Sequence, residues 1–201
     1  LEFRRVLFRS INGVSKTEVS GPIESSYRES QEGNVGRNDE DIVNGLLSQY
    51  GETGSGKYEF TAPNDFTKPY EEKGVFTLDP LSNFPGPAAM TIPVGLTQGR
   101  IYSIAKDKPL TTRKYPYSCF GRKYIDHYEI EFPKDTKITR IPDNLSYSKD
   151  GMTYKATYKK IGNMVNVDRE MILDNQNMYC VPERELRKQD FFDVLQKDLR
   201  S

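Results

Sequence analysis

The stretch that decides the fold is residues 152–173, MTYKATYKKIGNMVNVDREMIL. Apolar and polar side chains alternate along it on both sides of a turn at Ile161, Gly162 and Asn163. Because successive side chains of a strand point to opposite faces of a sheet, this period of two predicts two strands with one buried face each. The apolar positions are Met152, Tyr154, Ala156 and Tyr158 before the turn, and Val165, Val167, Met171 and Leu173 after it.

Strand patterns recur before this hairpin. Residues 124–132, YIDHYEIEF, alternate in the same way, and residues 137–141 are expected to form a short strand. Residues 57–61 and 74–79 are earlier strand candidates. Strands that follow one another closely and are joined by tight turns are typical of an antiparallel sandwich. We predict a mainly β fold: an antiparallel β-sandwich with a terminal helix, preceded by a mixed irregular α+β segment.

Two segments carry helical patterns. A helix near residues 39–50 has Asn38 or Asp39 as its cap, acidic residues in its first turn, and an apolar face. Pro182 is expected to open a terminal helix, with a buried stripe formed by Leu186, Phe191, Phe192, Leu195 and Leu199. Residues 11–30 are expected to hold one or two strands, with a break at Gly21 and Pro22.

The sequence pattern changes near residue 110. Residues 11–110 are irregular and include a proline-rich stretch, residues 80–99, that is expected to pack as an extended loop. Residues 111–201 are expected to form the β-sandwich-like domain. The first part holds 9 basic and 14 acidic residues, and the second holds 17 basic and 14 acidic. This offset is too small to indicate a nucleic-acid partner, and no apolar run reaches the length of a membrane span.

Residues 1–10, LEFRRVLFRS, are expected to be foreign to the protein. The string is identical to the translation of a common sequencing adapter, and the alternative is a basic, amphipathic N-terminal arm. Foreign residues of this kind carry no information about the fold of a protein. On this interpretation the chain is a fragment whose reading frame was cut upstream of Ile11. The remaining residues hold 26 basic and 28 acidic side chains.

The most tempting chemical motif is residues 51–57, GETGSGK, which fits the glycine and lysine spacing of a phosphate-binding loop. Tyr58 follows where a Ser or Thr hydroxyl is needed to hold magnesium. The segment before the motif is predicted to be a helix and the one after it a strand, which inverts the required order. We therefore interpret residues 51–57 as a flexible helix-to-strand loop.

Cys119 and His127 are the next candidates, because a thiol nucleophile needs an imidazole base within hydrogen-bond reach. Eight residues of strand would separate them by roughly 26 Å. We expect a surface histidine and no catalytic pair. Cys119 and Cys180 are the only cysteines and are either disulfide-bonded or two buried free thiols. No set of side chains has metal-ligand spacing, so no metal or cofactor is expected.

Several motifs resemble one known family. They are FTLDPLSNFPGP at residues 76–87, IPVGL at residues 92–96, RKYPY at residues 113–117, and the strand 124–132 followed by Ile141 and Pro142. Residues 13–200 resemble the C-terminal region of bacterial transglutaminase-like proteins whose N-terminus is a β-rich domain of unknown function. In that family a core with a Cys-His-Asp triad lies mid-chain and a β-sandwich tail follows it.

The resemblance implies that the catalytic core lies upstream of Ile11. This chain is then expected to be non-catalytic, with the parent protein a transglutaminase-like enzyme or protease. Its expected partners are the missing core, by intramolecular packing, and a protein or peptide substrate whose access it shapes. The resemblance also implies a periplasmic or cell-envelope setting, which favours a Cys119–Cys180 disulfide.

The alternative is a stand-alone β-sandwich that binds peptide or glycan. Tyr115, Tyr117 and Phe120 cluster near a predicted strand start and motivate this hypothesis. Exposure of these rings would favour a binding surface, and full burial would count against it.

Overall fold

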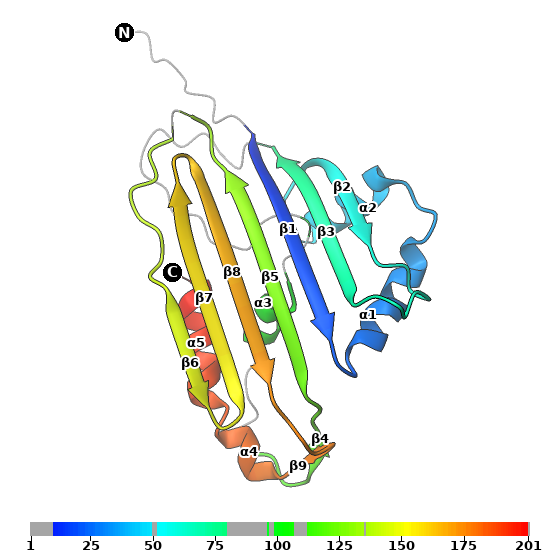
Figure 1. Cartoon of the computed structure of the whole chain (residues 1–201), viewed down its shortest axis with the longest axis vertical. Coiled ribbons are helices and arrows are strands. Elements are labelled where there is room, and N and C mark those ends of the chain that lie inside the picture. The colour runs from blue at the N-terminus through cyan, green and yellow to red at the C-terminus, as the bar shows by residue number, and fades with distance from the viewer. Residues whose placement is uncertain are drawn as a thin grey trace.

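The computed structural model describes residues 10–49, 52–79, 96, 99–106, 112–134 and 136–200. Its main feature is one antiparallel sheet of seven strands in the order β2-β3-β1-β5-β8-β7-β6 (Figure 1). Two short strands, β4 (Tyr117–Ser118) and β9 (Tyr179–Cys180), pair separately at one end. The strands of the large sheet are β1 (Ile11–Ser20), β2 (Gly54–Phe60), β3 (Tyr70–Leu78), β5 (Arg122–Glu131), β6 (Leu145–Lys149), β7 (Met152–Ile161) and β8 (Met164–Leu173).

The predicted mainly β class is confirmed, and so is the hairpin at residues 152–173, which is formed by β7 and β8. The sandwich arrangement was wrong, because all seven long strands lie in one sheet. A period of two shows that one face is buried but does not show what covers it. Residues 137–141 form no strand, since β7 pairs with β6 instead, and prolines at 133 and 142 bound the segment.

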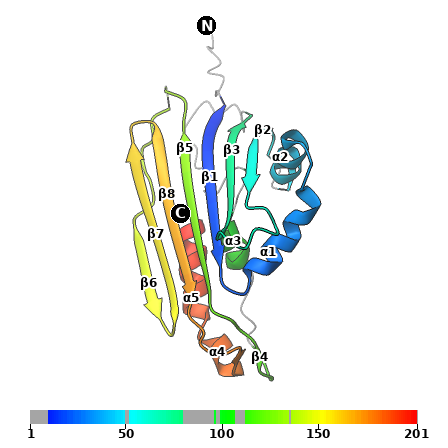
Figure 2. The same ribbon diagram turned by 45° about the vertical axis from the view of Figure 1, so that its right-hand side comes forward.

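The described residues also form helices. They are α1 (Glu24–Gln31), α2 (Asp39–Ser48), α3 (Gly99–Lys106), α4 (Pro182–Leu186) and α5 (Gln189–Leu199), with a short 3-10 helix, η1 (Glu32–Asn34), after α1. α5 packs on β6, β7 and α3, while α3 packs on β5. α1 contacts β3, and α2 contacts β2. Figures 1 and 2 show α3 and α5 behind the strands, so the sheet has a helix-covered face and an open face.

The helix predictions hold with two changes. Asn38 caps α2, since its side chain accepts a hydrogen bond from the Asp41 amide at 2.8 Å. Pro182 opens α4, but Leu186 is exposed because the chain breaks between α4 and α5. Residues 24–31 form a helix where a second strand was a possibility, and an ion pair between Glu24 and Arg28 supports it.

The sheet runs across the predicted boundary at residue 110. β1 comes from the first part of the chain and lies between β3 and β5, with β5 from the second part. The covered face is rich in fully buried tyrosines. Gly13 is needed there, because a Cβ at this position would lie 2.2 Å from the Phe76 ring. The predicted adapter segment, apart from Ser10, and nearly all of the proline-rich stretch lie outside the described residues.

Candidate functional site

A disulfide holds together one end of the molecule. Cys119 and Cys180 are bonded, with 5.8 Å between their Cα atoms and a separation of 61 positions in the sequence. β4 and β9 pair beside this bond, and the Cys119 amide donates to the Met178 carbonyl at 2.9 Å. Of the two alternatives left open by the sequence, a disulfide or two free thiols, the structure has the disulfide. We call this end, residues 112–121 and 174–188, the tip.

The tip exposes an unusual number of apolar side chains. Nine large apolar side chains are exposed among the described residues, and five of them belong to the tip. These five are Tyr115 (77% exposed), Met178 (67%), Tyr179 (70%), Val181 (60%) and Leu186 (56%), and we call them the tip surface. Soluble proteins seldom leave such side chains clustered without a binding role.

Electrostatic contacts brace the tip from within. The Arg113 guanidinium lies 4.3 Å from the centre of the Tyr117 ring, and the Lys188 ammonium lies 4.7 Å from it. Glu185 pairs with Lys188 at 2.9 Å and with Arg113 at 3.8 Å. Burial would raise the pKa of Glu185, but its hydrogen bond to Lys188 and the charges of Lys188 and Arg113 lower it. The carboxylate therefore stays ionised and ties α4 to the segment before β4.

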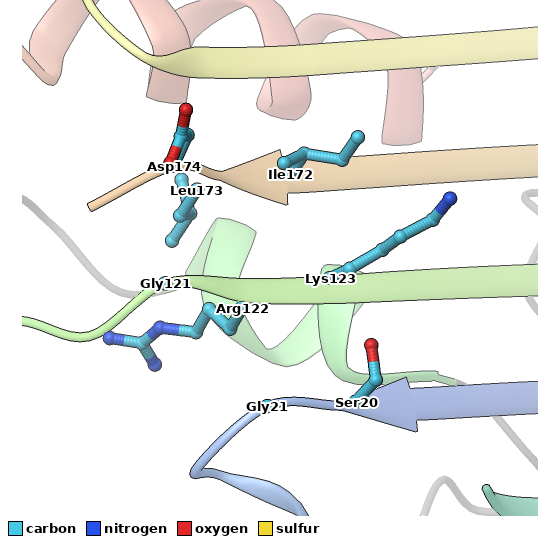
Figure 3. Close-up of a pocket in the computed structure, with 8 residues that line it drawn as sticks. All are labelled: Ser20, Gly21, Gly121, Arg122, Lys123, Ile172, Leu173 and Asp174. Atoms are coloured by element: carbon cyan, nitrogen blue, oxygen red, sulfur yellow. The ribbon is translucent and has the colours of Figure 1, made fainter. Parts of the chain in front are cut away.

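A shallow hollow lies on the sheet next to the tip (Figure 3). It has a volume of about 300 Å³ and lies where β1, β5 and β8 meet the tip. Gly21 and Gly121 leave it open because neither has a side chain, and a Cβ at Gly21 would lie 2.9 Å from the Gly121 carbonyl oxygen. We call it the glycine hollow. Its other lining residues are Ser20, Arg122, Lys123, Ile172, Leu173 and Asp174.

A second groove lies at the opposite end of the sheet, where β1 begins. Its volume is about 280 Å³. Val14 and Val75 are cross-strand partners in it, and Val75 is 46% exposed. Glu129 stands opposite Val14 on β5 and adds a carboxylate. We call it the N-terminal groove; it is lined by Asn12, Gly13, Val14, Val75, Phe76, Thr77, Glu129, Glu131 and Met164.

Most of the open face is polar and carries paired charges. His127 Nδ1 lies 2.6 Å from Asp168, and Nε2 lies 3.3 Å from Glu129. Burial lowers the pKa of His127, but the hydrogen bonds and charges of the two carboxylates outweigh it and raise the pKa above its ordinary value. Lys16 pairs with Glu18 at 2.8 Å. These contacts are typical of a solvated sheet surface.

A polar row crosses the covered face beneath the helices. Glu72, Thr17, Asp126 and Arg169 are successive cross-strand neighbours on β3, β1, β5 and β8. Arg169 Nε donates to Asp198 on α5 at 3.2 Å. The hydroxyls of Tyr154 and Tyr158 donate to the same carboxylate at 2.7 Å and 2.9 Å. The row therefore binds α5 to the sheet through buried, hydrogen-bonded groups.

Asp126 is the member of this row whose burial is least offset by hydrogen bonds and charges. Its side chain is fully buried and accepts a hydrogen bond from the Thr17 hydroxyl at 2.8 Å. Burial raises the pKa of Asp126 to about 7, against the lowering effects of Thr17 and the Arg169 charge. Burial likewise raises the pKa of Glu72, which receives hydrogen bonds from Tyr70 and Gln31. No sequence pattern marks these carboxylates, apart from acidic residues at positions that alternation assigns to the buried face.

The structure separates the sequence-predicted candidates. Residues 54–57 of the glycine-rich motif lie in β2, and Gly51 lies outside the described residues. Cys119 is held in the disulfide at the tip, whereas His127 lies within β5 on the open face. Of the three aromatic candidates, Tyr115 is exposed, while Tyr117 and Phe120 are half-buried.

The described residues contain no group of three or more His, Cys, Asp or Glu side chains placed to hold a metal ion. Within the same residues, no helix is both long enough and apolar enough to cross a membrane.

Comparison with known proteins identifies part of the chain. Searches of curated proteins and of solved structures each returned no match. One family model matches residues 89–180, a stretch that includes four strands of the large sheet and both cysteines. β1, β2, β3 and α5 lie outside it. Residues 89–180 thus form a domain of the family described as Domain of Unknown Function with solved-structure structure (DUF3858).

Proposed function

We propose that this chain is the non-catalytic accessory region of a transglutaminase-like envelope protein and packs against that protein's catalytic core. The N-terminal groove is the observation that carries this proposal. The groove lies over the first residues of β1, so any native chain that precedes Ile11 leaves the sheet beside it. A domain tethered there reaches the groove at high effective concentration.

The chemistry of the groove suits contact with another folded domain. Val14, Val75 and Met164 supply apolar surface, while Glu129 and Glu131 supply carboxylates beside it. Interfaces between domains of one chain are typically mixed in this way, with apolar centres and polar rims. The link to a transglutaminase-like core rests on the sequence motifs at residues 76–96 and 113–117.

The envelope setting is part of the proposal. Disulfides form and persist in oxidising compartments, and the Cys119–Cys180 bond is consistent with one. In this setting the parent protein carries the enzymatic activity, as a transglutaminase-like enzyme or protease. The present chain positions the core and shapes the access of a protein or peptide substrate to it.

The test begins with the reading frame upstream of Ile11. We expect it to encode a Cys, then a His, then an Asp on a papain-like core. That core and residues 11–201 are then expressed separately and their affinity is measured by isothermal titration calorimetry. Val75→Lys is expected to weaken binding about tenfold or more, because taking an ammonium out of water into the interface costs more than 1.4 kcal/mol.

Val35→Lys is the matched control, because Val35 is also exposed but lies away from the groove, after η1. It is expected to leave the affinity unchanged. A different kind of domain upstream would refute the proposal, and so would equal binding by Val75→Lys and the unaltered chain.

A stand-alone module that binds peptide or glycan is the second candidate. The glycine hollow favours it, because its volume of about 300 Å³ reaches the lower end of small-ligand sites and Arg122 and Lys123 offer hydrogen-bond donors. Peptide and glycan panels screened by thermal shift test this candidate. A hit should be lost in Lys123→Ala and kept in Lys155→Ala, which alters an exposed lysine on β7.

A further inference from the structure

We infer that the tip surface docks on the surface of an anionic lipid bilayer, with its apolar side chains entering the interface between headgroups and acyl chains. This inference is independent of the packing proposed at the N-terminal groove, because it concerns the opposite end of the sheet. It concerns attachment to a membrane surface, which needs no spanning segment.

The apolar side chains of the tip have the composition that such an interface favours. Tyr115 and Tyr179 are 77% and 70% exposed, and tyrosine rings prefer the membrane–water interface because they combine an apolar body with a polar hydroxyl. Met178, Val181 and Leu186 are more than half exposed and have no polar atom in their side chains. Removing the apolar surface of these five side chains from water would be favourable in free energy.

The charges of the tip specify the sign of the surface. The tip, residues 112–121 and 174–188, holds five basic side chains and three acidic ones. One of the three, Glu185, is buried and paired with Lys188 and Arg113. The tip therefore carries a net positive charge beside its exposed apolar side chains, although the whole chain carries no formal net charge. Basic side chains next to exposed apolar ones complement anionic headgroups.

The position and rigidity of the tip favour a flat surface over a peptide. β4, β9 and α4 project beyond the ends of the long strands (Figures 1 and 2), so a planar bilayer can reach them without touching the sheet. The five apolar side chains come from the segment before β4, from β9 and from its flanks, and from α4, and they line neither described groove. The disulfide fixes these segments before docking, which reduces the entropy lost on binding.

Tryptophan fluorescence provides a direct test because the chain has no tryptophan. Tyr179→Trp places a single reporter on the tip, and Phe66→Trp places one on an exposed loop outside it. Each oxidised protein is mixed with vesicles of phosphatidylcholine alone or with an equal share of phosphatidylglycerol. We expect a blue shift only for Tyr179→Trp and only with phosphatidylglycerol.

Co-sedimentation with the same vesicles measures the affinity. Lys114→Gln with Arg187→Gln is expected to lower partitioning about 25-fold, because each basic residue near an anionic surface contributes about fivefold. Lys155→Gln with Lys159→Gln removes two exposed charges from β7 and should have little effect. Met178→Ser with Tyr179→Ser should lower partitioning at least about tenfold, whereas Val35→Ser should not.

Circular dichroism and thermal melts establish that each variant is folded. The inference is overturned if the oxidised chain binds both vesicle types equally, or if it binds neither. It is also overturned if the tip variants bind as well as the unaltered chain. Sedimentation velocity adds a further refuting outcome: a dimer that Met178→Ser with Tyr179→Ser abolishes would assign the tip surface to a second copy of this chain.

Discussion

Replacing Asp126 by asparagine should stabilise this protein at neutral pH. Asp126 is fully buried and accepts one hydrogen bond, from Thr17. The asparagine Oδ1 can accept the same bond, so the variant removes the charge and keeps the shape. Arg169 remains paired with Asp198 on α5. Glu72, the other buried carboxyl in the row, keeps its hydrogen bonds to Tyr70 and Gln31.

The magnitude follows from the pKa of the carboxyl. Burial raises the pKa of Asp126 from 3.8 to about 7, so the folded state binds a proton that the unfolded state has released between these values. The free energy of unfolding therefore falls as the pH rises from about 4 to about 7. At 1.36 kcal/mol for each pH unit, the loss at pH 8 is about 4 kcal/mol. The Asp126→Asn variant has no carboxyl to ionise at this position, so its free energy of unfolding does not fall in this way.

Urea denaturation of the oxidised protein at several values between pH 4 and pH 8.5 measures the effect. The variant and the unaltered chain should be similarly stable near pH 4, and their difference should grow to about 4 kcal/mol near pH 8. Asp143→Asn, which alters an exposed carboxylate, should follow the unaltered chain throughout. A lower stability of Asp126→Asn at pH 8, or an unchanged pH slope, would refute the reasoning.

Three further changes test other features. Cys119→Ser with Cys180→Ser should lower the free energy of unfolding by about 4 kcal/mol, because a 61-residue loop is released in the unfolded chain; thermal melts under oxidising conditions measure it. Asp168→Asn should lower the raised pKa of His127 toward 6.5, as measured by NMR titration, and should remove stabilisation that is present below pH 6.5 and lost as the pH rises through the raised pKa. Gly13→Ala should destabilise by about 1–3 kcal/mol in urea titrations, because its Cβ would overlap the Phe76 ring; Gly33→Ala, with open space around it, is the control.

The predicted strands and helices depended on local patterns, and most of them were found close to their predicted positions. The alternation at residues 152–173 and 124–132 specified the buried face of β7, β8 and β5 residue by residue. The number of sheets could not be predicted from these local patterns. The apolar face of a strand can be buried by a second sheet or by helices such as α3 and α5. The alternating sequence of β5 is compatible with either covering layer.

The tip and the polar row show what the sequence could not supply. Tyr115 was a candidate from its neighbours, but it shares the tip with Met178 and Val181 only because a disulfide joins segments 61 residues apart. Asp126 sits where alternation predicts burial, and its environment depends on Arg169 and Thr17 from two other strands. Long-range pairing decides both features, and periodicity contains no information about it.

The place of β1 in the sheet has a consequence for how the chain folds. Its residues come first among the described strands, yet their partners lie about 50–120 residues later, on β3 and β5. During synthesis this central strand has no neighbour until β3 has emerged, and it is not flanked on both sides until β5 has followed. Until then the backbone N–H and C=O groups of β1 have no strand partners, so this sheet cannot be built from the N-terminus onward in the order of synthesis.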